Sequence, residues 1–183
     1  MYENNYKNPG LTGSADLENF LQLIADLDKE LELFALGGTA MVLKGIKEST
    51  KDIDFLTTAK YEQIKSLFQL AGLKEESTSQ LCNIWHLKDI RIDIFYCEFI
   101  LGYSLPSDWK KLSEHLRTIG KVKLFILNWY DIIITKIARS ERRDIEDGIA
   151  IIKHEKLDFE KLKQRYLFSI FKIPDVTIAE WHP

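Results

Sequence analysis

The segment Leu36–Phe55 constrains this chain more than any other, because a Gly-Gly pair in it precedes two carboxylates separated by a single residue. The run Glu32–Leu36 predicts a short buried strand, and Gly37-Gly38 permits a tight turn in which backbone N–H groups can approach a ligand. We expect a helix over Thr39–Lys44. Unpaired N–H groups and the positive dipole end at a helix start favour an anionic group such as a triphosphate.

The two carboxylates belong to the predicted strand Asp52–Phe55. Side chains alternate along a strand, so Asp52 and Asp54 share one face while Ile53 and Phe55 point into the core. Two neighbouring carboxylates resist joint ionisation unless a cation joins them, and hard oxygen ligands suit Mg²⁺. The segment therefore predicts a phosphate site beside a metal site, although a structural turn and a solvated strand face would explain each part separately.

The order of these features resembles the signature of the DNA polymerase β-type nucleotidyltransferase superfamily. Here an apolar residue and Gly-Gly are followed by thirteen residues, Thr39–Lys51, and then by Asp-Ile-Asp-Phe. The resemblance implies transfer of a nucleoside monophosphate from an NTP such as ATP, with two Mg²⁺ ions as cofactor. It also implies that Gly37, Gly38 and Thr39 hold the phosphates. Lys44 and Lys51 are auxiliary candidates, for which solvent exposure is the simpler expectation.

A third metal-binding carboxylate is expected on a neighbouring strand, and Asp93 is the candidate. The run Ile90–Tyr96 alternates, which places Arg91 and Asp93 on one face and isoleucines on the other. The alternative is an exposed carboxylate paired with Arg91. Given the upstream motif, we predict that Asp52, Asp54 and Asp93 together form the catalytic and metal-binding set.

A second informative segment is Asp131–Asp147, which is expected to be helical. Lys136 shares a helix side with Ile132 and Ile133, so it either reaches the surface or enters a pocket. Asp144 and Asp147 are neighbours on the next helix, where one of them could hold Lys136, Arg139 or Arg143. The alternative is a salt-bridge cluster between the two helices.

This second pattern resembles the C-terminal motifs of abortive-infection type II (AbiEii-like) toxins and related uncharacterised nucleotidyltransferases. The resemblance implies that Lys136 contacts the nucleotide and that Asp144 or Asp147 supports the site. It also implies an RNA or protein acceptor and an antitoxin partner. Aminoglycoside-modifying nucleotidyltransferases resemble the chain as well, which keeps a small-molecule acceptor open. A catalytically inactive binding module is the alternative from another class, but all three acidic positions are filled.

Composition agrees with a compact protein. The chain has 183 residues, 45% of them hydrophobic, and a net charge of −3 argues against a general polyanion binder. However, Trp109–Arg143 holds nine Lys or Arg against three acids, so a local basic surface for RNA or nucleotide phosphate competes with an ordinary solvated face. Cys82 and Cys97 are expected to be reduced core residues. No signal peptide or membrane-spanning run is found, so we expect a cytoplasmic protein of undetermined oligomeric state.

The predicted fold class is α+β, a nucleotidyltransferase fold with a mixed sheet, flanking helices and a C-terminal helical extension. Residues 1–127 are expected to form the catalytic core and 128–183 the helical region. Two hairpins are predicted, Cys82–Tyr96 around Lys88-Asp89 and Leu116–Ile126 around Gly120. The expected helices are Asp16–Leu31, Tyr61–Leu70, Trp129–Arg139, Glu141–Lys153 and Asp158–Phe171.

Overall fold

A computed structural model describes residues 10–79, 81–96, 98–101, 103–139 and 141–171 of the chain. Its centre is a seven-stranded mixed sheet with the order β10-β11-β2-β4-β7-β6-β5. The pairs β11–β2 and β4–β7 are parallel, and the remaining pairs are antiparallel. The predicted α+β class, with a mixed sheet and flanking helices, is confirmed.

The strands of this sheet are β2 (Leu31–Ala35), β4 (Ile53–Thr57), β5 (Lys74–Thr78), β6 (Cys82–Leu87), β7 (Ile90–Phe95), β10 (Glu114–Ile119) and β11 (Val122–Ile126). Two small two-stranded sheets pair β1 (Thr12–Gly13) with β3 (Ser49–Thr50) and β8 (Phe99–Ile100) with β9 (Tyr103–Ser104). The helices are α1 (Ser14–Ala25), α2 (Gly37–Leu43), α3 (Tyr61–Leu70), α4 (Trp109–Leu112), α5 (Trp129–Arg139), α6 (Arg142–Glu155) and α7 (Phe159–Phe171).

Aromatic packing fixes which face of the sheet each helix covers. Phe20 of α1 stacks on Phe55 of β4 at 6.1 Å between ring centroids, and it meets Phe68 of α3 edge to face at 5.8 Å. Phe68 in turn contacts Trp85 of β6. Helices α1 and α3 therefore cover the face that carries Phe55. Since strand side chains alternate, Asp54 must point to the other face.

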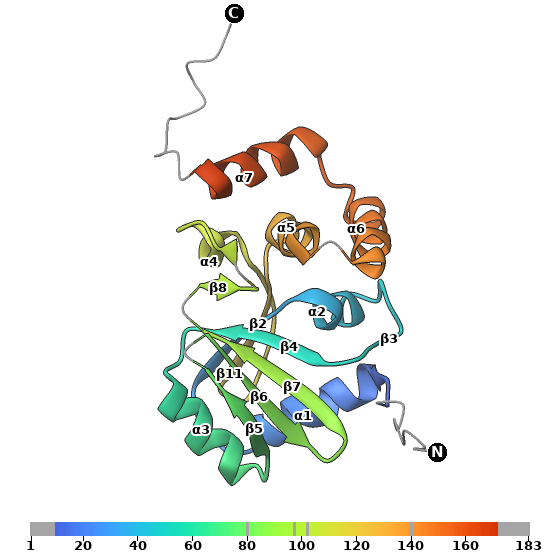
Figure 1. The fold of residues 1–183 in the computed structure, drawn as a ribbon. Helices are drawn as coiled ribbons and strands as arrows, with labels where there is room; N and C mark the ends of the chain where they lie inside the picture. The colour runs from blue at the N-terminus through green and yellow to red at the C-terminus, as the bar shows by residue number, and fades with distance from the viewer. Residues whose placement is uncertain (1–9, 80, 97, 102, 140, 172–183) are drawn as a thin grey trace, which may run out of the picture.

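The other face is covered only in part. Trp109 of α4 packs on Phe34 of β2, with ring centroids 4.7 Å apart. Figure 1 shows α5, α6 and α7 gathered on the side of the sheet away from α1 and α3, with α2 between the sheet and this group. None of the described helices is long and apolar enough to cross a membrane. The predicted division at residue 127 stays a prediction.

The local sequence patterns located most elements. Both hairpins form, with Lys88 and Gly120 in the left-handed conformation that their tight turns require. The first helix was predicted too long, because Leu27 and Leu31 continue its apolar periodicity, although Leu31 already belongs to β2. Cys82 is a free, half-buried cysteine, whereas Cys97 lies outside the described residues.

Candidate active site

Asp54 and Asp93 are the centre of the candidate site. They are register partners on the parallel strands β4 and β7, so their side chains leave the same face of the sheet. Asp52 directly precedes β4 and lines the same cavity as Asp54. The three carboxylates that the sequence singled out are therefore brought to one region, although Asp52 is not part of the strand as expected.

The Gly-Gly turn lies so close to its neighbours that larger residues would not fit there. Gly37 has φ +55°, and a Cβ atom at that position would lie 3.2 Å from Oδ2 of Asp54. A Cβ at Gly38 would lie 2.2 Å from Oγ1 of Thr50, which is too close for any side chain without a shift. Helix α2 begins at Gly37 itself, two residues earlier than predicted.

The hydroxyl of Thr39 contacts the backbone of β4 and its approach, and not a position open to phosphate as expected. The threonine side chain is fully buried, and its Oγ1 accepts a hydrogen bond from the N–H of Asp54 at 2.8 Å. The same hydroxyl faces the carbonyl oxygen of Asp52 at 3.4 Å. Because both contacts are to the backbone between the two carboxylates, Thr39 positions them and does not offer its hydroxyl to a phosphate here.

Asp93 is held by the partner that the alternative interpretation named. Arg91 donates from Nε to Oδ1 at 2.7 Å and from Nη2 to Oδ2 at 2.8 Å, a bidentate ion pair. Among the described residues, no group of three or more His, Cys, Asp or Glu side chains is arranged to hold a metal ion. Arg91 thus neutralises Asp93 in this conformation.

The charge balance of the remaining carboxylates is consistent with a site that needs a cation. Burial, with the nearby charges of Asp93 and Asp52, raises the pKa of Asp54 to about 8. Burial also raises the pKa of Asp52, and Arg91 opposes that rise. Two crowded carboxylates that resist ionisation, both made of hard oxygen donors, fit a divalent cation such as Mg²⁺.

A network of ion pairs forms the opposite wall. The Nζ of Lys136 lies 2.7 Å from Oδ2 of Asp147 and 3.4 Å from Oδ1 of Asp144, and the lysine is 5% exposed. Arg139 donates from Nε to Asp144 at 2.7 Å, and Lys47 donates to Asp147 at 2.8 Å. The salt-bridge cluster considered for α5 and α6 is therefore present, and it also faces the cavity.

The two aspartates of this network are firmly ionised. Burial opposes the charge of Asp144, but hydrogen bonds from Arg139 and the charge of Lys136 lower its pKa to about 2. Burial likewise opposes ionisation of Asp147, but hydrogen bonds from Lys136 and Lys47 lower its pKa. Asp144 and Asp147 consequently act as fixed anions that hold three cations in position.

A cavity of about 320 Å³ lies between the Asp52–Asp54 segment and part of the ion-pair network, and neither Asp93 nor Asp144 is among its lining residues. Its charged lining consists of five cations and three acids: Lys47, Lys51, Lys136, Arg139, Arg143, Asp52, Asp54 and Asp147. Gly37 and Gly38 complete it beside the carboxylates. Lys51 thus lies at the site, whereas Lys44 is paired with Glu114 at 2.9 Å and does not line the cavity.

Lys47 was missed by the sequence interpretation. Its partner Asp147 lies 100 residues further along the chain, so no local spacing connects the two. The pairing depends on how α6 packs beside the loop after α2, which only the tertiary fold determines.

Comparison with known proteins decides the family. The model of a family described as nucleotidyltransferase of unknown function (DUF6036) matches residues 15–174. The chain belongs to this family. It is therefore a nucleotidyltransferase, as the Gly-Gly and Asp-Ile-Asp pattern predicted. No curated protein sequence matches the chain.

Solved structures of nucleotidyltransferases share the fold. The crystal structure of ANT(2″)-Ia in complex with adenylyl-2″-tobramycin is 14% identical, with a TM-score of 0.65 over 87% of this chain and 99% of that chain. The lincomycin-bound lincosamide antibiotic adenylyltransferase LnuA is 16% identical, with a TM-score of 0.57 over 78% of this chain and 98% of that chain. JHP933 from Helicobacter pylori is 17% identical, with a TM-score of 0.51 over 84% of this chain and 73% of that chain. At these identities the similarity to the three solved structures shows a shared fold, and the AbiEii-like branch stays a prediction.

Proposed function

We propose that this nucleotidyltransferase moves a nucleoside monophosphate from an NTP to a hydroxyl acceptor in a Mg²⁺-dependent reaction that releases pyrophosphate. The observation that carries the proposal is the two-sided cavity, with Asp52 and Asp54 on one wall and a cluster of cations on the other. A triphosphate with a divalent cation carries both kinds of charge that such walls would bind.

The cationic wall would hold the triphosphate. Lys47, Lys136 and Arg139 carry three positive charges against the two negative charges of Asp144 and Asp147, and Arg143 and Lys51 lie at the same cavity. The aspartates keep these cations in fixed positions, so little side-chain entropy is lost when an anion binds. Lys136 is the innermost of them, while Lys47 is 37% exposed.

The carboxylate wall would hold Mg²⁺ through Asp52 and Asp54, with Asp93 as the third ligand once it leaves Arg91. Such ions, when bound, stabilise the attacking and leaving oxygens of an in-line displacement. Thr39 keeps the backbone of Asp52 and Asp54 at a fixed distance from α2. Gly37 and Gly38 let the chain pass close to Asp54 without a side chain that would fill the cavity.

In the proposed reaction, the acceptor oxygen forms a bond to the α-phosphorus of the NTP. The bond from that phosphorus to the oxygen that bridges the α and β phosphates breaks. The β and γ phosphates leave as pyrophosphate beside the cationic wall. The acceptor proton goes to Asp93, the carboxylate nearest the uncovered part of the sheet, and then to water.

A small-molecule acceptor is the second candidate. It is favoured by the fold shared with ANT(2″)-Ia and LnuA, proteins described with an aminoglycoside and a lincosamide. The cavity charges oppose a polycationic acceptor, because five cations face three acids there. A toxin role with an antitoxin partner stays a prediction of the AbiEii-like resemblance.

The test is label transfer. The protein is incubated with each α-labelled NTP, Mg²⁺ and either total RNA or a panel of antibiotics, and labelled product and pyrophosphate are measured. We expect transfer that requires Mg²⁺ and is lost in Asp54→Asn but kept in Asp89→Asn, which changes an exposed hairpin carboxylate. Transfer by Asp54→Asn at the wild-type rate would place the chemistry elsewhere.

A further inference from the structure

The part of the sheet beyond the catalytic carboxylates is polar and uncovered. On the face that carries Asp54 and Asp93, β7, β6 and β5 have no described helix over them (Figure 1). Asp93 pairs in register with Ile84 of β6, and Ile84 pairs with Ser77 of β5. Ser77 is exposed and Ile84 is half-buried. Asp93 itself is 8% exposed beneath Arg91, so an acceptor on this face would reach it once Arg91 moves.

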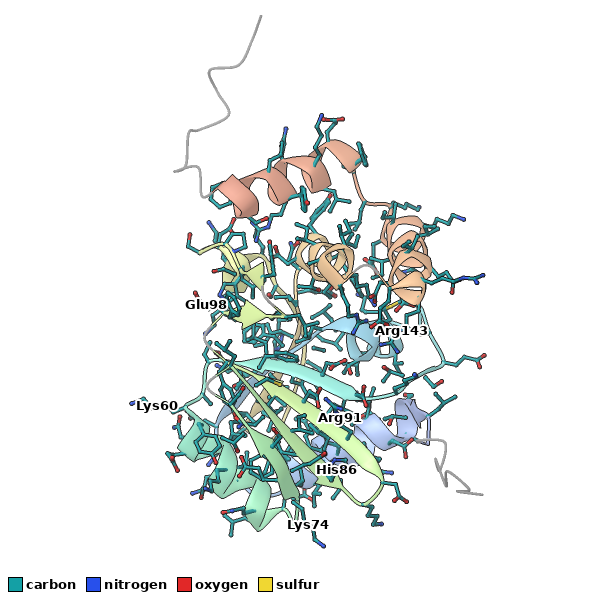
Figure 2. The ribbon with its side chains drawn as sticks, viewed as in Figure 1. Lys60, Lys74, His86, Arg91, Glu98 and Arg143 are labelled. Carbon is teal, nitrogen blue, oxygen red and sulfur yellow. The ribbon has the colours of Figure 1, made fainter. Side chains whose placement is uncertain are left out.

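A row of basic side chains crosses the same face one step further along the strands. Arg91 of β7 pairs in register with His86 of β6, which pairs with Lys74 of β5. Paired residues leave the same side of a sheet, so all three point outward beside Asp93. Neighbouring strands lie ~4.8 Å apart, so the row spans about 10 Å. Figure 2 shows Arg143, Arg91, His86 and Lys74 in succession from the cavity across the sheet.

Local charges agree with a path that leads into the active site. Arg91 and Arg143 are both close enough to Asp52 to lower its pKa against the effect of burial. The side chains of Arg91 and Arg143 are 42% and 46% exposed. His86 is paired with Glu76, which a β-bulge turns toward this face, and Lys74 is exposed. If Asp93 held a metal ion, the guanidinium of Arg91 would be free to bind a ligand.

The basic surface expected from Trp109–Arg143 is distributed differently. Three of its cations form ion pairs near the sheet edge opposite to β5: Lys110 with Glu32, Arg117 with Glu18 and Lys121 with Asp28. Of that stretch, Lys136, Arg139 and Arg143 line the cavity, and Figure 2 shows Arg143 above Arg91.

We propose that Lys74, His86, Arg91 and Arg143, the basic row, bind the phosphates of a single-stranded RNA whose terminal hydroxyl is the acceptor. The proposal rests on the proposed function and names its acceptor class. A polycationic acceptor would meet the positive charges of Lys74, Arg91 and Arg143 along this row, of which Arg91 is paired with Asp93 and Arg143 with Glu141. Contacts to phosphates carry no sequence information, so binding through this row should tolerate different sequences.

The experiment measures RNA binding separately from NTP binding. A fluorescein-labelled single-stranded RNA of mixed sequence is titrated with the protein in Mg²⁺, and its anisotropy is followed between about 50 and 200 mM salt. We expect Lys74→Gln to weaken binding about three- to tenfold at the lowest salt. It should also reduce the slope of log affinity against log salt by about 0.7, the contribution of one phosphate contact on a single strand. His86→Gln should weaken binding in the same direction.

Lys163→Gln is the matched control, since Lys163 is a 58% exposed lysine on α7. It should leave the affinity and the slope unchanged. Binding of a fluorescent ATP analogue should be the same in wild type, Lys74→Gln and Lys163→Gln, because Lys74 does not line the NTP cavity.

Each outcome bears on one proposal. Equal RNA affinity and slope in wild type and Lys74→Gln, with normal binding of the ATP analogue, would overturn the basic row and leave the nucleotidyl transfer intact. Tobramycin binding that strengthens in Lys74→Gln would also overturn it, in favour of a cationic acceptor. RNA binding that depends on Lys74 in a protein that binds no nucleotide would support the row and remove the proposed NTP site.

Discussion

Asp54 and Asp93 lie side by side in register on two parallel strands, and among the described residues Asp93 alone of the two forms an ion pair. Asp54 lies between Asp93 and Asp52, and burial together with these two charges raises its pKa to about 8. This asymmetry determines how the site should respond to substitution, to pH and to metal.

Asp54→Asn should abolish transfer while leaving the fold intact. The substitution removes a metal ligand but no core packing, and it relieves repulsion among three carboxylates. The melting temperature without metal should therefore hold or rise. Activity and thermal melting of Asp54→Asn are compared with those of Asp89→Asn. A large drop in melting temperature would show that Asp54 supports the fold instead.

Metal affinity should rise with pH up to about 8. The native pKa of Asp54 is above its unfolded value, so without metal its contribution to stability is greatest below about pH 4 and is lost as pH rises toward 8. A metal must displace the proton, so affinity should increase about tenfold per pH unit in this window. Mn²⁺ binding measured by electron paramagnetic resonance at several pH values tests this. A flat profile that matches Asp54→Asn would contradict it.

Arg91→Gln should strengthen metal binding and weaken catalysis or RNA binding. The guanidinium competes with a metal for both oxygens of Asp93, so its removal frees a ligand. The Mn²⁺ titration is repeated on Arg91→Gln and on Lys88→Gln, an exposed lysine in the adjacent turn. If Arg91→Gln weakens metal binding, the ion pair orients Asp93 for the metal and does not compete with it.

Lys136→Ala should cost stability as well as nucleotide affinity. The lysine is 5% exposed and joins two buried aspartates, so its loss leaves uncompensated charge worth ~3 kcal/mol or more. Lys47→Ala should cost less than about 1 kcal/mol, because Lys47 is 37% exposed. Denaturant unfolding and titration with an ATP analogue on both variants separate the two effects. Weaker nucleotide binding in a stable Lys47→Ala protein would place the triphosphate at this wall.

Gly38→Ala should destabilise the protein by about 1–3 kcal/mol through overpacking against Thr50. Thr50→Gly should rescue it in part, because it removes the two closest atoms. Gly148→Ala is the matched control. That glycine lies inside α6 with nothing within 4 Å of a new Cβ, so alanine should stabilise the protein by about 0.5–1 kcal/mol. The three variants and the double mutant are compared by urea unfolding.

The sequence predicted the parts of the site that depend on local periodicity. Alternation in β4 and β7 placed Asp54 and Asp93 on strand faces, and helical spacing made Asp144 and Asp147 neighbours on one helix, where one of them could hold Lys136, Arg139 or Arg143. These patterns could not show that Thr39 is buried against the backbone of Asp52 and Asp54, since that contact depends on how α2 packs on β4.

Local sequence patterns could not predict the strand order either. Register between β4 and β7, or between β7 and β6, joins segments whose pairing depends on the whole sheet. The basic row becomes apparent only when Lys74, His86 and Arg91 are placed on three neighbouring strands. Counting charges along Trp109–Arg143 therefore selected a stretch whose cations face several directions.

The contacts of Lys47 and Lys136 with Asp147 show that the candidate active site is formed by two separate parts of the chain, the sheet region and helices α5 and α6. The carboxylates come from the sheet, whereas most of the cationic wall comes from α5 and α6. A fragment ending before α5 would keep Asp52, Asp54 and Asp93 and lose most of the cations that we propose hold the pyrophosphate. Exchange of these two helices among relatives would therefore change how the triphosphate is held, while the carboxylates of the sheet stay in place.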